Sequence, residues 1–68
     1  MYFKEIRKTD HYKRYHEKQV PWSKAVEIIL NTKSKRKKGN KIEMENGYYI
    51  LCEIKDGILY VINAKRTK

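Results

Sequence analysis

The chain is 68 residues long, which is enough for one small domain, and its 17 Lys and Arg against 8 Asp and Glu give a net charge of +9. Its single cysteine, Cys52, excludes an internal disulfide and fits a reducing cytoplasm. No stretch approaches the roughly 20 apolar residues of a membrane span, and residues 1–10 lack the apolar centre of a signal peptide. We therefore expect one basic, cytoplasmic domain over residues 1–68.

The positive charge is gathered in two stretches, residues 33–41 and 65–68. Clustered cations attract phosphate backbones or an acidic protein, and the lack of a broad apolar helix face argues against a membrane surface. Abundant Lys, Glu, Ile and Tyr are also typical of thermophile proteins, although those usually balance their charges. RNA or another nucleic acid is therefore the expected partner. Because the core of so short a chain contributes little stability, a homodimer is also possible.

The first half of the chain predicts a strand and two helices. A short strand is expected over residues 2–7, although its first residues also suit a helix start. Thr9 or Asp10 suits the N-cap of a short helix over 11–18, in which Tyr12 and Tyr15 share a face. Pro21 ends that helix and begins a second one. The second helix is the clearest element, because its apolar residues recur at i, i+3, i+4 and i+7: Trp22, Ala25, Val26, Ile29 and Leu30.

The second half predicts strands joined by tight turns. Alternating residues over 41–45 and apolar runs over 48–54 and 58–64 indicate three strands. Asn46-Gly47 and Asp56-Gly57 are strong hairpin signals, because both positions of such turns need positive φ. Residues 31–40 are polar and basic, and we expect a mobile loop or the frayed start of a strand there. The predicted fold class is α+β: two helices packed on a three-stranded antiparallel meander, with a possible N-terminal strand.

Two short strings carry a resemblance to a known family. Residues 20–25, V-P-W-S-K-A, and residues 61–66, V-I-N-A-K-R, resemble the start of the second helix and the closing strand of BrnT-type toxins, in the RelE-like group of toxin–antitoxin systems. The resemblance implies a RelE-like fold, a metal-independent endoribonuclease activity and an acidic antitoxin as partner. His11 also matches the opening histidine of a related family of short domains, whose arginines are replaced here by Tyr15 and Gln19.

Metal-independent RNA cleavage needs a general base, a general acid and cations that stabilise the phosphorane. His11 together with Lys65 or Arg66 of the last strand is the candidate catalytic set. His11 and His16 stand five residues apart, which is about 140° around a helix, so we expect them on different faces and not as an acid/base pair. The alternative for His11 is a capping or interface histidine. Cleavage, and binding without cleavage, both remain open.

Nucleic-acid binding is expected from the basic stretches and from an aromatic ring on the sheet. Tyr49 is the best candidate for stacking on a base, although tyrosine also suits a strand for packing reasons alone. The basic run is alternatively a solvated loop without a ligand. One Cys, two His and scattered carboxylates show no ligand spacing, so neither a metal nor a cofactor is expected. The expected phosphate contacts are Lys33, Lys35, Arg36, Lys37, Lys38, Lys41 and Lys68.

Overall fold

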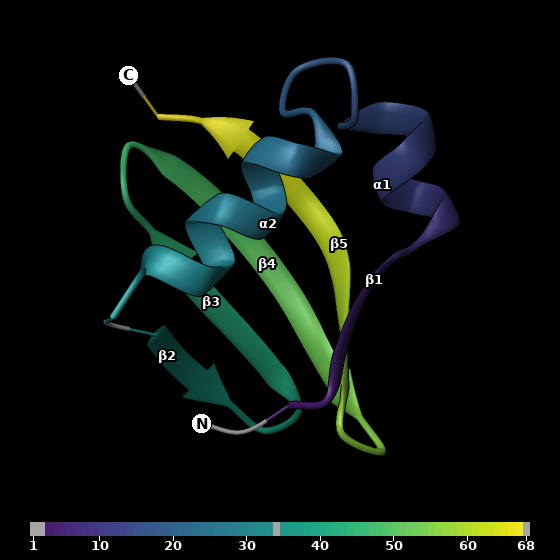
Figure 1. The fold of residues 1–68 in the computed structure, drawn as a ribbon, viewed down its shortest axis with the longest axis vertical. Coiled ribbons are helices and arrows are strands. Elements are labelled where there is room, and N and C mark those ends of the chain that lie inside the picture. Colours follow the sequence, from purple (N-terminus) through teal and green to yellow (C-terminus); the bar gives the residue numbers. More distant parts are fainter. Residues whose placement is uncertain (1–2, 34, 68) are drawn as a thin grey trace.

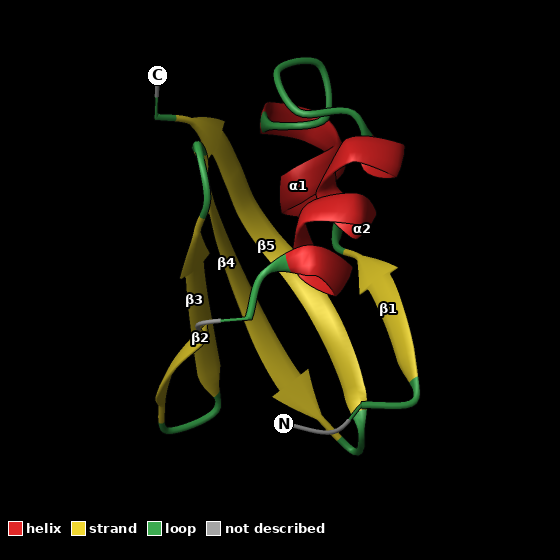
Figure 2. Ribbon diagram, turned by 60° about the vertical axis from the view of Figure 1, so that its left-hand side comes forward, coloured by secondary structure: helices red, strands yellow, loops and turns green. Residues whose placement is uncertain are grey.

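The computed structural model describes residues 3–33 and 35–67, in which two helices pack on one face of a five-stranded sheet (Figures 1 and 2). The sheet order is β1-β5-β4-β3-β2, in which β2 to β5 form an antiparallel meander and β1 lies parallel to β5. This arrangement confirms the α+β class and adds one strand to the predicted meander. The elements in chain order are β1 (Glu5–Lys8), α1 (Asp10–Tyr15), α2 (Trp22–Asn31), β2 (Lys35–Lys38), β3 (Lys41–Glu45), β4 (Tyr48–Lys55) and β5 (Ile58–Arg66).

The added strand, β2, lies where a loop or a frayed strand start was expected. Lys38 pairs with Lys41, so only Gly39 and Asn40 separate β2 from β3. Gly39 has a φ of 61°, and a glycine at the first turn position is the residue that this kind of two-residue hairpin requires. The prediction of a mobile loop is therefore wrong for residues 35–38, which form an edge strand of the sheet.

The first helix, α1, is shorter than predicted, because it ends at Tyr15. Thr9 is its N-cap, as one of the two predicted alternatives: its hydroxyl accepts from the Tyr12 amide at 3.2 Å and donates to the Val61 carbonyl at 2.8 Å. Tyr12 is fully buried, whereas Tyr15, three residues further along the same helix, is 63% exposed. The rest of the domain therefore covers Tyr12 but not Tyr15, the last residue of the helix.

The second helix, α2, begins at Trp22 directly after Pro21, as predicted, but a different stripe of residues faces the sheet. Ala25, Ile28, Ile29 and Thr32 are buried, and these four residues also follow the i, i+3, i+4, i+7 rule. Leu30, which the sequence placed on the buried stripe, is 65% exposed. The helix is therefore rotated towards Ile28, because the sheet contacts only one of the two overlapping apolar stripes.

The core lies between the helices and the sheet. An extra residue in β5, Ile62, interrupts the pairing of β5 with β4. Because of this bulge, Val61 and Ala64 are both buried although three positions separate them. The buried side chains of the sheet are Ile42, Met44, Ile50, Cys52, Leu59, Val61 and Ala64.

Both predicted hairpin turns are present, but they differ in backbone conformation. Asp56 and Gly57 have φ values of 55° and 78°, as expected for a two-residue hairpin turn. In the Asn46-Gly47 turn only Gly47 has a positive φ, at 76°, so the prediction of positive φ at both positions is wrong there. In the described part of the chain, no helix is both long and apolar enough to cross a membrane.

Candidate nucleic-acid interface

The sheet face opposite the helices has no helix packed on it in the described part of the chain (Figure 2). Strand residues alternate between the two faces, and cross-strand partners share a face, so the registers determine which side chains lie there. We call this set the open face. Its members are Glu5, Arg7, Arg36, Lys38, Lys41, Glu43, Glu45, Tyr49, Leu51, Glu53, Lys55, Ile58, Tyr60, Asn63 and Lys65.

Tyr49 is held in place on the open face by two neighbours. Its hydroxyl donates to Oε2 of Glu43 at 2.6 Å, and the ammonium of Lys65 lies 5.5 Å from the centre of its ring. The hydrogen bond raises the pKa of Tyr49 and lowers the pKa of Glu43. At neutral pH the hydroxyl is therefore a donor to an ionised carboxylate. The ring is half-buried, so part of it faces solvent.

Glu43 is a member of this site that the sequence analysis did not single out. Glu45 pairs with Tyr49 across the hairpin, so Glu43 is the diagonal neighbour of Tyr49 on the same face. A two-residue turn at Asn46-Gly47 would pair Glu45 with Tyr48, one residue away from the observed register, so the partner of Tyr49 could not have been found from that turn. Glu43 also lies 3.9 Å from Nζ of Lys38. It thereby connects the aromatic ring to the basic strand β2.

The basic run of residues 33–41 is divided between the two sides of the sheet. Arg36 pairs with Glu43 and Lys38 with Lys41, so these three cations lie on the open face. Lys35 and Lys37 pair with the buried Met44 and Ile42 and point to the helix side. There, the ammonium of Lys35 donates to the carbonyl of Thr32. Lys33 precedes β2 and is exposed, and Lys68 lies outside the described residues.

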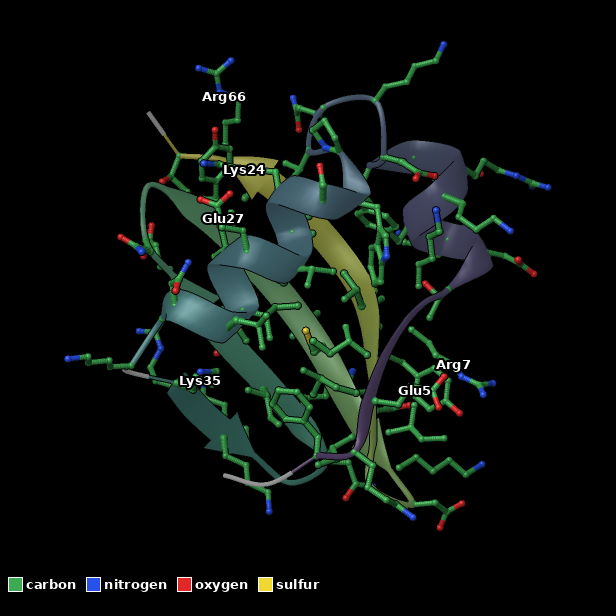
Figure 3. All side chains as sticks on the ribbon, in the orientation of Figure 1. Glu5, Arg7, Lys24, Glu27, Lys35 and Arg66 are labelled. Atoms are coloured by element: carbon green, nitrogen blue, oxygen red, sulfur yellow. The ribbon has the colours of Figure 1, made fainter. Side chains whose placement is uncertain are left out.

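The three candidate catalytic residues do not form one group. Lys65 lies over Tyr49 on the open face, whereas the next residue, Arg66, points to the other side of β5. Arg66 is exposed at the end of β5 and extends away from the body of the domain (Figure 3). His11 belongs to α1, on the helix side of the sheet (Figure 2).

The two histidines lie together, contrary to the sequence prediction. Nε2 of His11 is 3.2 Å from Nε2 of His16, and the ring centres are 5.0 Å apart. The prediction assumed one continuous helix, but α1 ends at Tyr15 and His16 has a non-helical backbone, with φ −126° and ψ −22°. Burial, and then the neighbouring His11, lower the pKa of His16, and the backbone of Ala64 partly opposes that shift.

The described residues contain no enclosed pocket, so the candidate interface is an open surface. Nor do these residues include a group of three or more His, Cys, Asp or Glu side chains arranged to hold a metal ion. Comparison with protein-family models, with curated proteins and with solved structures found no match to this chain. The functional argument therefore depends on the geometry of the open face.

Proposed function

We propose that the protein binds single-stranded RNA on the open face of its sheet. The observation that carries this proposal is Tyr49, whose ring lies on the uncovered face beneath the ammonium of Lys65. Proteins that bind single strands combine aromatic rings, on which bases stack, with cations that follow the phosphate backbone. Of the six cations that share this face with Tyr49, the four on strands β2, β3 and β5 are Arg36, Lys38, Lys41 and Lys65.

The geometry favours a single strand over a duplex. Direct readout of duplex DNA places an exposed helix or a two-stranded ribbon in the major groove. Here the helices have their apolar faces on the sheet, and on α2 Nζ of Lys24 lies 3.5 Å from Oε1 of Glu27 (Figure 3). A broad sheet face with an aromatic ring instead matches the way in which splayed bases are bound. The open face also carries four glutamates, which repel phosphate groups. The RNA backbone is therefore attracted only to the parts of this face where cations are grouped.

The proposal includes a RelE-like arrangement but not RNA cleavage. The order of one strand, two helices and then a run of strands is what the toxin resemblance implies, and it supports this part of the proposal. An acidic antitoxin-like protein would compete for the same cations as RNA. Cleavage needs an acid and a base near one phosphate, and His11 belongs to α1 whereas Lys65 lies over Tyr49 on the open face. Binding is therefore the function that the geometry supports.

A labelled single-stranded RNA tests this proposal by fluorescence anisotropy. We expect Tyr49→Ala to weaken binding by about fivefold or more, since stacking on one base contributes roughly 1–3 kcal/mol. Tyr15→Ala is the matched control, because Tyr15 is 63% exposed but belongs to the helix side. Equal affinity of the Tyr49→Ala variant and the wild type would overturn the stacking site.

The salt dependence tests the phosphate contacts separately. Four contacts, by Arg36, Lys38, Lys41 and Lys65, predict that log affinity falls against log salt with a slope of about −3. Lys65→Ala should make the slope shallower by about 0.7, whereas Lys13→Ala on α1 should not change it. Affinity that does not change with salt would contradict the proposal. Single-stranded DNA of the same sequence, and a gel of the incubated RNA, report ligand preference and cleavage.

A further inference from the structure

The histidine pair lies on the helix side of the domain and takes no part in the proposed RNA site. His11 and His16 are the two histidines of the chain. The His11 ring contacts both His16 and Tyr15, with ring centres 5.0 Å away in each case. His11 is exposed and His16 is half-buried, so solvent and small ions can reach the pair.

The position of His16 is held by the backbone. Its amide donates to the Tyr12 carbonyl at 2.9 Å, and its own carbonyl accepts from Val20 at 2.9 Å and from Gln19 at 3.1 Å. Tyr12 is fully buried and its hydroxyl donates to the carbonyl of Val20. These bonds close the turn from α1 to α2, so the two rings are brought together before any ligand binds.

The distance between the two Nε2 atoms is 3.2 Å. Zn²⁺ binds histidine nitrogens at roughly 2.0–2.1 Å, so two nitrogens on a tetrahedral ion are about 3.3 Å apart, and two adjacent nitrogens on an octahedral ion are about 2.9 Å apart. The observed distance lies between these values. We propose that His11 and His16 bind one divalent transition-metal ion through their Nε2 atoms, with water completing the coordination.

The same distance argues against an acid/base role for the pair. In phosphoryl transfer the attacking and leaving oxygens lie in line on opposite sides of the phosphorus, so acid and base must reach two separated atoms. Two Nε2 atoms in direct hydrogen-bond contact share one proton and face a single point between them. When both neutral rings carry their proton on Nδ1, both Nε2 atoms have a free lone pair. A metal ion can then occupy the position of the shared proton.

The surroundings predict which ions bind. Lys13 and Arg14 stand in the last turn of α1, and their positive charge disfavours ions held by charge alone, such as Mg²⁺. Imidazole suits Ni²⁺, Cu²⁺ and Zn²⁺, for which the nitrogen lone pair supplies the bond. We therefore expect Ni²⁺ and Zn²⁺ to bind and Mg²⁺ not to bind.

Calorimetric titration of the full chain with Zn²⁺ and with Ni²⁺ tests the proposal. We expect saturation at one ion per chain, and a loss of affinity of at least about tenfold in both His11→Gln and His16→Gln. The double variant should bind no more weakly than the weaker single variant, because either loss removes the chelate. Gln19→Ala, an exposed neutral change in the same turn, is the matched control and should bind as the wild type does.

A second measurement distinguishes loss of the site from loss of the fold. Circular dichroism should show native secondary structure in all variants, and Zn²⁺ should raise the Tm of the wild type and of Gln19→Ala, but not of the histidine variants. Wild-type affinity in the double histidine variant, or a wild type without saturable binding, would overturn the proposal. No nucleic acid is present in these titrations, so they are independent of the RNA assay.

Discussion

At the scale of single residues, Tyr12 links the first helix to the beginning of the second through contacts that no sequence pattern predicts. Its side chain is fully buried, its hydroxyl donates to the carbonyl of Val20, and its ring lies 5.6 Å from that of Trp22. Burial, and then the charge of Glu17, raise the pKa of Tyr12 from 10.0 to about 12. The tyrosine thus anchors α1 to the start of α2 while it is neutral.

Tyr12→Phe is predicted to change both the stability and its pH dependence. At neutral pH the variant should be less stable by about 1–2 kcal/mol, because the buried Val20 carbonyl loses its donor. Between pH 10.0 and about 12 the unfolded chain has lost the Tyr12 proton while the folded protein still holds it. The free energy of unfolding of the wild type is therefore largest below pH 10.0 and decreases as the pH rises towards 12. By about pH 11 this loss is roughly 1.4 kcal/mol, which the variant does not undergo.

Urea unfolding between pH 7 and 11 measures this effect, and the difference between wild type and variant cancels the titration of the lysines. The stability advantage of the wild type should shrink above about pH 10 and vanish near pH 11. A difference that stays constant over this range would show that the hydroxyl titrates alike in the folded and the unfolded chain.

At the scale of elements, β2 shows how a basic segment becomes part of a sheet. All four residues of the strand are Lys or Arg, which is a composition that keeps an exposed sheet edge from pairing with other chains. The strand nevertheless pairs with β3 in full register, because the turn at Gly39 and Asn40 returns the chain directly. This alternation places Arg36 and Lys38 on the open face, where the proposed RNA site needs them.

Gly39→Ala is predicted to destabilise this edge of the sheet by about 1–2 kcal/mol, because an L-residue is strained at positive φ. A Cβ at Gly39 would meet no atom within 4 Å, so the cost is confined to the backbone. Amide hydrogen exchange should speed up in β2 and remain unchanged in β5. Asn40→Ala, in the same turn but without a positive φ, is the control, and equal exchange in both variants would contradict the argument.

At the scale of the whole molecule, the two sides of the sheet have different roles. One side packs on the helices and supplies the core, and the other carries the mixed row of tyrosine, cations and glutamates of the open face. The net charge of +9 is distributed over both sides, because the basic residues of β2 alternate between them. The folded state therefore contains many like charges at short range, which repel one another.

Salt is predicted to stabilise the folded protein. Raising KCl from about 20 mM to about 500 mM shortens the screening length and reduces repulsion among the lysines. A gain of about 1 kcal/mol corresponds to a rise in Tm of roughly 4–8 °C for a domain of this size. Lys37→Glu introduces a negative charge between Arg36 and Lys38, so the rise should be smaller in that variant. A Tm that falls with KCl would mean that ion pairs, such as Lys8 with Glu17 at 2.8 Å, dominate instead.

The sequence by itself determined the features that depend on neighbouring residues in the chain. The N-cap at Thr9, the helix start after Pro21 and the Asp56-Gly57 turn were all predictable, because each depends on local hydrogen bonds or on the φ values that one residue type permits. The position of Tyr49 on a strand after a turn belongs to the same group. A similar local signal, Gly39-Asn40, would also have indicated β2.

Only the tertiary structure decided which of several local solutions was used. The two apolar stripes of α2 are equivalent in spacing, and packing on the sheet selected the one that buries Ile28 and exposes Leu30. The early end of α1 brought His11 and His16 together, although helical spacing separates them. The placement of Lys65 over Tyr49 depends on the registers of β4 and β5. These outcomes arise from burial and long-range pairing, which local sequence patterns do not encode.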